Sequence, residues 1–114
     1  MIIGLIPSRL NSSRLKEKPL LEIDGLPIII HTLKRAMLSK KLDKVIVCTD
    51  HKKIFKIVEK FGGQAMLTSN KHINGTERIA EVAKKFRAKL VVDIQGDEPL
   101  VDPSDIDKVI NFHL

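Results

Sequence analysis

The 114-residue chain has one cysteine, no tryptophan, no tyrosine and four phenylalanines. A single cysteine excludes a disulfide within the chain and is typical of proteins from a reducing compartment, so we expect a cytoplasmic protein. Because aromatic side chains make up only 4% of the residues, few of them can stack on bases. The composition therefore argues against a nucleic-acid partner.

Long apolar runs and the common glycine motifs are also missing. No run approaches the roughly 18 apolar residues that a membrane helix needs, and residues 1–7 lack the features of a signal peptide, so we expect no membrane partner. Neither G-x-G-x-x-G nor G-x-x-x-x-G-K-[ST] occurs, which removes the main support for a dehydrogenase or a P-loop protein. The four histidines are too dispersed to predict a metal cluster.

Strand-like and helix-like segments alternate along the chain. This order predicts an α/β protein with a mostly parallel sheet and helices on both faces. Two aspartates, Asp50 and Asp102, are expected to cap the helices that follow them, and Cys48 is expected to be a buried core residue in its strand. The expected strands span residues 2–6, 44–48, 64–67 and 89–94, and the expected helices span 27–39, 51–61, 76–87 and 103–114.

A basic loop follows the first expected strand. Arg9, Arg14 and Lys18 supply fixed positive charges there, and Ser8 adds a hydroxyl donor. Guanidinium and ammonium groups are suited to phosphates, although a solvated basic loop is an equally good interpretation of the spacing alone. The net charge of +6 does not decide between them, because much of it belongs to lysines on expected helix faces.

An acidic pair, Asp97 and Glu98, follows the last expected strand. Ligands of open α/β sheets bind at the carboxyl ends of the strands, and a carboxylate there can hold Mg²⁺ together with substrate phosphates. Adjacent side chains point in different directions, so one carboxylate is sufficient, and we assign the metal to Asp97. A third polar segment contains His72 and leads into an expected helix start at residues 75–78.

Together these segments resemble the 3-deoxy-manno-octulosonate cytidylyltransferase family, the CMP-Kdo synthetases. The family pattern begins with a strand and I-P-[AS]-R, followed by S-[ST]-R-L-x-x-K-P-L. It continues with a strand and T-D, a loop H-x-x-G-T-[DE]-R, and a strand and Q-G-D-E-P. In this chain the motifs stand as Ile6-Pro7-Ser8-Arg9, Ser12-Ser13-Arg14-Leu15, Lys18-Pro19-Leu20, Thr49-Asp50, His72, Gly75-Thr76-Glu77-Arg78 and Gln95-Gly96-Asp97-Glu98-Pro99.

The resemblance implies a Rossmann-like nucleotidyltransferase fold and transfer of CMP from CTP to 3-deoxy-D-manno-octulosonate (Kdo), with diphosphate leaving, for lipopolysaccharide synthesis. It implies Mg²⁺ on Asp97, and Lys18 and Asp97 as catalytic residues. It also implies a substrate-binding set in which the loop before the third helix frames the cytidine and the glutamine lies near the sugar acid. That set is Ser8, Arg9, Arg14, Lys18, His72, Gly75, Thr76, Arg78 and Gln95.

Some features depart from the family pattern. Lys16-Glu17 replaces a more usual Pro-Gly, and Ser69 stands where members often carry arginine. The resemblance covers only the N-terminal half of a family member, so residues 1–114 are interpreted as the nucleotide-binding part of a single cytidylyltransferase domain. On this interpretation the chain is truncated and has only part of the site, so we expect it to be a poor or inactive enzyme alone. The family's homodimer is expected for the full-length protein and not for this fragment.

Two alternatives stay open. The first is activation of a different acidic sugar, such as a sialic or other nonulosonic acid or an amino analogue of Kdo. The second is a non-catalytic nucleotide-binding fragment. CTP binding without turnover favours the fragment, whereas diphosphate release that needs CTP, Mg²⁺ and Kdo together favours the enzyme.

Overall fold

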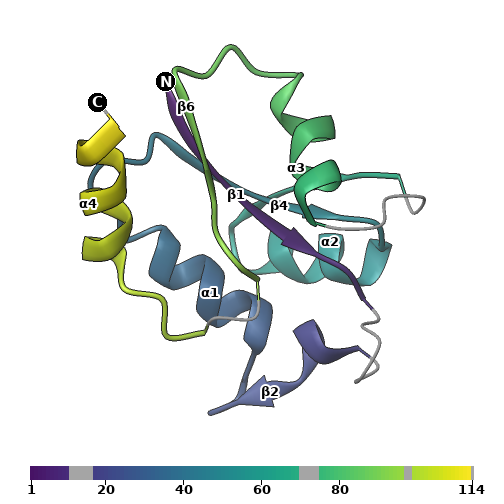
Figure 1. The fold of residues 1–114 in the computed structure, drawn as a ribbon. Helices are drawn as coiled ribbons and strands as arrows, with labels where there is room; N and C mark the ends of the chain where they lie inside the picture. The colour runs from purple at the N-terminus through teal and green to yellow at the C-terminus, as the bar shows by residue number, and fades with distance from the viewer. Residues whose placement is uncertain (11–16, 70–74, 97–98, 114) are drawn as a thin grey trace.

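The computed structural model describes residues 1–10, 17–69, 75–96 and 99–113, and Figure 1 shows its arrangement. One sheet contains four strands in the order β5-β4-β1-β6, and every neighbouring pair is parallel. Its strands are β1 (Ile2–Ser8), β4 (Lys44–Thr49), β5 (Gln64–Leu67) and β6 (Leu90–Asp93). The predicted parallel sheet is thus confirmed.

The alternation of side chains along β1 separates two apolar layers. Ile6 packs on one face of the sheet with apolar residues of three helices, and Ile3 and Leu5 pack on the other face with residues of one helix. Helices therefore cover both faces, as predicted (Figure 1). The first face carries α1 (Ile28–Ala36), α2 (Lys52–Lys60) and α4 (Pro103–His113), and the second carries α3 (Gly75–Ala83).

A small hairpin leads from the first strand to the first helix. A single 3₁₀ turn, η1 (Lys18–Leu20), precedes β2 (Glu22–Ile23) and β3 (Leu26–Pro27). Asp24 and Gly25 join the two strands with φ values of 53° and 81°, the left-handed region that two-residue hairpin turns favour. His31 of α1 holds the hairpin, because its Nε2 lies 2.5 Å from the carbonyl oxygen of Ile23.

Two helices end earlier than the sequence pattern predicts. The first was expected to reach residue 39 and the third residue 87, but α1 ends at Ala36 and α3 at Ala83. In both cases the chain tightens into turns with i→i+3 hydrogen bonds, such as Ser39 N to Ala36 O (3.0 Å) and Phe86 N to Ala83 O (3.1 Å). Apolar spacing continues through these turns and therefore does not reveal where the helix ends.

The last helix is fastened at its start and along its side. Asp102 caps it as predicted, because its Oδ1 accepts hydrogen bonds from the backbone N and the Oγ of Ser104, each 2.8 Å long. Asp107 accepts from Ser39 Oγ (2.5 Å) and from the backbone N of Lys40 (3.2 Å). Val109 is apolar, but 49% of it is exposed, because the buried residues of α4 are Ile106 and Ile110. No helix in the described part of the chain is long and apolar enough to cross a membrane.

Because Asp102 and Asp107 stabilise α4 as carboxylates, we expect the stability of α4 to fall in acid. Hydrogen bonds from Ser104 lower the pKa of Asp102, and the bond from Ser39 lowers the pKa of Asp107, both below the ordinary value of 3.8. A lowered folded pKa gives stability that is complete above pH 3.8 and is lost as the pH falls through the folded pKa. Amide protection factors in α4, measured from pH 6 to pH 2, should fall in this window before those of β4.

A pair of variants checks the origin of the effect. Asp107→Asn should reduce α4 protection already at pH 6, whereas Asp105→Asn, which removes only an exposed ion pair with Lys108, should change it little. Protection in α4 that stays constant down to pH 2 would contradict the assignment.

Candidate functional site

The topology of the sheet selects one edge as the place for a ligand. After β1 the chain crosses to β4 on one side, continues to β5, and then returns to β6 on the other side of β1. The strand order therefore changes direction at β1, which lies between β4 and β6. In open α/β sheets this switch point is where ligands bind.

A cavity of about 230 Å³ lies at this switch point. Residues after β1 and residues after β6 line it together, with contributions from η1, α1 and α3. Six of the substrate-binding residues predicted from the sequence are among its walls, although they come from four separate parts of the chain. The lining residues are Pro7, Ser8, Arg9, Lys18, Pro19, Ile28, Gly75, Arg78, Gln95 and Gly96.

The other predicted site residues stand differently. Thr76 is exposed in the first turn of α3 and does not line the cavity. Arg14, His72 and Asp97 lie outside the described residues. The chain position of Asp97 is nevertheless informative, because the residue directly before it, Gly96, is part of the cavity wall.

Close backbone packing joins the two strand ends at the cavity. Ile94 N donates to Leu5 O over 2.9 Å, which continues the pairing of β6 with β1. A Cβ on Gly96 would lie 2.7 Å from the carbonyl oxygen of Pro7, and one on Gly75 would lie 3.1 Å from Pro7 Cγ. Glycine at position 96 is therefore needed for this approach, a requirement that the motif alone did not reveal.

Gly96→Ala should consequently destabilise the protein and distort the cavity. Its methyl group meets a backbone atom that cannot rotate away, so overpacking is expected to lower the free energy of unfolding by about 1–3 kcal/mol. Thermal unfolding and the amide resonances of Ser8 and Arg9 measure the two effects. Gly25→Ala is the control, because its Cβ would meet nothing within 4 Å and only its φ of +81° is unfavourable. Gly25→Ala should lower the unfolding temperature while the Ser8 and Arg9 resonances keep their positions. Equal resonance shifts in the two variants would contradict the steric explanation.

Positive charge and an unused hydroxyl characterise the cavity. Arg9 is exposed and Lys18 is partly buried, and no carboxylate of the described residues is part of the lining. Ser8 is the last residue of β1 and only 5% exposed, and its Oγ has no hydrogen-bond partner among the described residues. Cationic side chains beside a free hydroxyl favour an anionic ligand with several oxygen acceptors.

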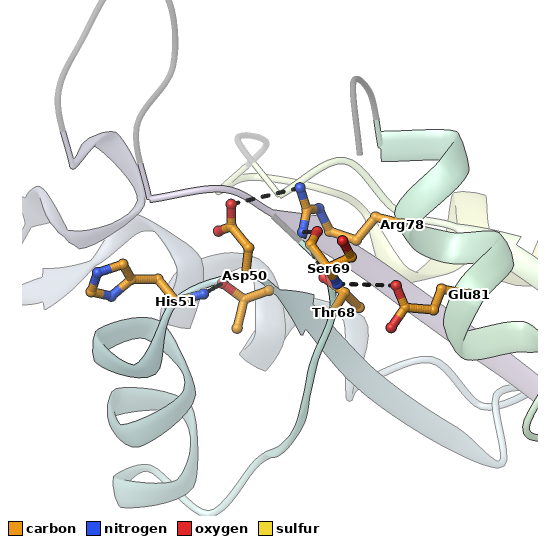
Figure 2. Close-up of polar contacts among 7 residues, drawn as sticks. Asp50, His51, Thr68, Ser69, Arg78 and Glu81 are labelled. Carbon is orange, nitrogen blue, oxygen red and sulfur yellow. Dashed lines mark hydrogen bonds and ion pairs between the residues drawn. The ribbon is translucent and has the colours of Figure 1, made fainter. Parts of the chain in front are cut away.

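The T-D motif at the end of β4 has a different role from the one predicted. His51, not Asp50, caps α2, because His51 Nδ1 accepts a hydrogen bond from Lys53 N (3.1 Å). The Asp50 carboxylate instead lies 3.8 Å from Nη2 of Arg78 (Figure 2). A buried guanidinium needs a nearby negative charge, which Asp50 supplies from a distant part of the chain. The cap of α2 is therefore His51, one residue later than predicted.

Arg78 is fully buried although it belongs to the cavity wall. Its Nη1 donates to Thr68 Oγ1 over 2.5 Å and to the backbone oxygen of Ser69 over 3.3 Å (Figure 2). The sequence placed Arg78 in the substrate-binding set but did not reveal Asp50 and Thr68 as its partners. The only signal for the first was an aspartate at a strand end, which a helix cap explains equally well.

Neither Cys48 nor the carboxylates of the described residues form a reactive or metal-binding group. Cys48 is fully buried, and burial raises the pKa of its thiol to about 12, so the prediction of an inert core residue is confirmed. No three His, Cys, Asp or Glu side chains converge to hold a metal within residues 1–10, 17–69, 75–96 and 99–113.

Comparison with known proteins agrees with this geometry. The family model described as cytidylyltransferase matches residues 3–114. A 3-deoxy-manno-octulosonate cytidylyltransferase from Chlorobaculum parvum is 42% identical over 109 residues, which are 96% of this chain and 44% of that protein. An 8-amino-3,8-dideoxy-manno-octulosonate cytidylyltransferase from Shewanella sp. (strain W3-18-1) is 45% identical over 114 residues, which cover 97% of this chain and 46% of that protein.

The solved structures include a similar protein with a nucleotide. The structure of CMP:2-keto-3-deoxy-manno-octonic acid synthetase complexed with CTP has a TM-score of 0.95 and 40% identity, over 97% of this chain and 46% of that one. The chain thus spans about half the length of the relatives that it matches. From the match over residues 3–114 and from these identities, we conclude that the chain belongs to the cytidylyltransferase family.

Proposed function

We propose that the protein transfers CMP from CTP to 3-deoxy-D-manno-octulosonate, releasing diphosphate and forming CMP-Kdo for lipopolysaccharide synthesis. The observation that carries the proposal is the cavity at the switch point, where Arg9, Lys18 and Gln95 come together from distant parts of a cytidylyltransferase chain. The similar synthetase that was solved with CTP supports the choice of nucleotide. A cytoplasmic location belongs to the same proposal and is supported by the single, buried cysteine.

The cationic side chains would bind the triphosphate. Arg9, Lys18 and, from the sequence, Arg14 neutralise negative charge that grows on the diphosphate as it leaves. The sugar hydroxyl attacks the α-phosphorus and releases its proton to solvent, a new P–O bond forms to the sugar, and the bond from the α-phosphorus to the oxygen shared with the β-phosphate breaks, so that diphosphate leaves. Holding both reactants in line lowers the barrier because orientation no longer has to be found by diffusion. Gln95, an exposed residue of the cavity lining, would contact the sugar acid.

Magnesium is the metal that we propose for this site. The described lining contains no carboxylate, so the metal would be held mainly by nucleotide phosphates and by one acidic side chain outside the described residues. Asp97 would supply that side chain, since it follows directly on the wall residue Gly96. When bound, Mg²⁺ neutralises phosphate charge and helps to orient the transfer.

A second acidic sugar is a specific alternative. The Shewanella relative is named for 8-amino-3,8-dideoxy-manno-octulosonate, and its 45% identity is as high as that of the Kdo relative. Both sugars have the same acid group and anomeric hydroxyl, so the cavity described here does not separate them. We also propose a homodimer for the full-length protein, as the family resemblance implies.

The test measures diphosphate release with CTP, Mg²⁺ and each sugar acid in turn. We expect release only when all three components are present, with Kdo giving a higher kcat/KM than its 8-amino analogue. A higher kcat/KM for the amino sugar would transfer the assignment to that substrate. CTP binding without release under any of these conditions would favour the nucleotide-binding fragment.

A further inference from the structure

Arg78, a residue of the cavity wall, connects three segments of the chain. It projects from α3 and reaches Asp50, which follows β4, and Thr68 and Ser69, which follow β5 (Figure 2). Thr68 is bound to the end of β4 as well, because its backbone N donates to Thr49 O over 2.7 Å. The carboxyl ends of β4 and β5 therefore meet the helix α3 at this guanidinium.

Glu81 strengthens the connection from the same face of α3. It lies three residues after Arg78, and its Oε1 accepts a hydrogen bond from Ser69 N over 3.0 Å (Figure 2). Arg78 thus binds the carbonyl of Ser69 while Glu81 binds its amide. Two side chains on successive positions of one helix face hold a single residue after β5, which fixes the helix against the sheet edge.

The first residue of α3 transmits this position to the cavity. Gly75 lines the cavity and lies almost one helical turn before Arg78. It packs so closely on Pro7 that an added Cβ would be 3.1 Å from Pro7 Cγ. A shift of α3 along or away from the sheet would therefore change the cavity wall directly.

The charge of Arg78 is already engaged by the protein. Nη1 is used by Thr68 and Ser69, and the Asp50 carboxylate beside Nη2 offsets much of the positive charge that a phosphate would otherwise meet. Nε and Nη2 have no hydrogen-bond acceptor within the described residues, so direct contact with a ligand is the competing explanation.

We propose that Arg78 is a positioning residue: with Asp50 and Thr68 it holds the N-terminus of α3 against Pro7, and CTP affinity depends on it without contact to the phosphates. This inference rests on the proposed function, because CTP is the ligand whose affinity reports the position of α3. It revises the expectation that Arg78 contacts the substrate.

The two explanations predict opposite results for Asp50→Asn. If Arg78 positions α3, loss of the carboxylate loosens the connection and CTP should bind several-fold more weakly. If Arg78 contacts the phosphates, removal of the competing negative charge should make CTP bind more tightly. Thr68→Val adds a second distinction, because it removes one hydrogen bond without changing shape or charge. Positioning predicts affinity about three- to tenfold weaker, as expected for one hydrogen bond, and direct contact predicts no loss.

Arg78→Lys and Arg78→Gln complete the series. A lysine keeps the charge but cannot form the forked contacts, so positioning predicts that both variants lose CTP affinity to a similar extent, by tenfold or more. Retention of affinity by Arg78→Lys alone would overturn the proposal. If either Arg78 variant does not fold, the Asp50 and Thr68 variants decide the question.

Controls separate positioning from general destabilisation and from charge. Val82→Ala creates a void in the core beneath the same helix, where Val82 is fully buried, and should lower the unfolding temperature while CTP affinity stays within about twofold. Arg87→Gln removes the same charge from an exposed position and should behave like wild type. A loss of affinity in Val82→Ala equal to that of Thr68→Val would overturn the specific role of Arg78.

A ligand-free measurement keeps this inference independent of the proposed function. Thr68→Val should move the Gly75 amide resonance in the absence of nucleotide, because α3 shifts where it meets Pro7. An unchanged Gly75 resonance would overturn the inference even if wild type binds CTP. If wild type does not bind CTP but the Gly75 resonance shifts in Thr68→Val, the proposed function is overturned. The positioning of α3 by Arg78 would then still hold.

Discussion

Asp97→Asn is expected to lower the rate of diphosphate release by about a hundredfold or more. Asparagine keeps the size of the side chain but removes the charge that would hold Mg²⁺ beside the phosphates. A metal contributes several kcal/mol to such a transfer, and each 1.4 kcal/mol corresponds to about a factor of ten in rate. Folding should change little, and thermal unfolding in the absence of nucleotide checks this.

The neighbouring carboxylate is the matched control for Asp97. Glu98→Gln removes the same charge from the adjacent position and should keep most of the activity. Equal losses in the two variants would mean that the acidic pair acts through its total charge. Unchanged turnover in Asp97→Asn would remove Asp97 from the mechanism.

Lys18→Gln is expected to weaken CTP binding by about ten- to a hundredfold. A hydrogen bond to a charged group contributes about 1.5–3 kcal/mol, and Lys18 lines the cavity together with the residues after β6. Cytidine has no phosphates, so its affinity should be the same in wild type and variant. Titration calorimetry with CTP and with cytidine gives both values.

Lys53→Gln is the control for the loss of one positive charge. Lys53 forms an exposed ion pair (3.0 Å) with Glu17, the residue directly before Lys18. Neither Lys53 nor Glu17 lines the cavity. Its replacement should change CTP affinity by less than about twofold, as expected for a screened surface charge. A similar loss in both variants would show that the net charge of the chain, and not Lys18 itself, attracts the nucleotide.

Local patterns were sufficient for much of the fold. The bounds of β5 agree with the prediction because its apolar run stands between Gly62-Gly63 and a polar segment. Asp102 caps α4 as predicted, since the carboxylate and the amide that it binds are two residues apart. Contacts of this kind depend on neighbours in the sequence, which the pattern contains.

Features that depend on distant residues could not be predicted in the same way. Asp50 appeared to be a helix cap, yet it pairs with Arg78, 28 positions later in the chain, and the cap passes to His51. Burial of Arg78 requires the register of α3 against β4 and β5, which no local pattern specifies. Val109 has the apolar character of its neighbours, and only the packing of α4 shows that its side is exposed.

The candidate site lies between these cases. Arg9 and Gln95 follow strands that a parallel sheet places side by side, so their convergence on one cavity follows from the topology. The motif identified Gly96 but not the reason for it, which is the 2.7 Å approach that a Cβ would make to Pro7 O. Arg14, His72 and Asp97 stay predictions from the sequence.

Amide resonance mapping during a CTP titration with Mg²⁺ tests the central claim most directly. The claim is that groups from the ends of β1 and β6 bind one triphosphate together. It predicts saturable shifts at Ser8, Arg9, Lys18, Gly75, Gln95 and Gly96 with a single dissociation constant. Shifts confined to the other hollow of the surface, around His31 and Phe61, or no saturable shifts at all, would contradict it.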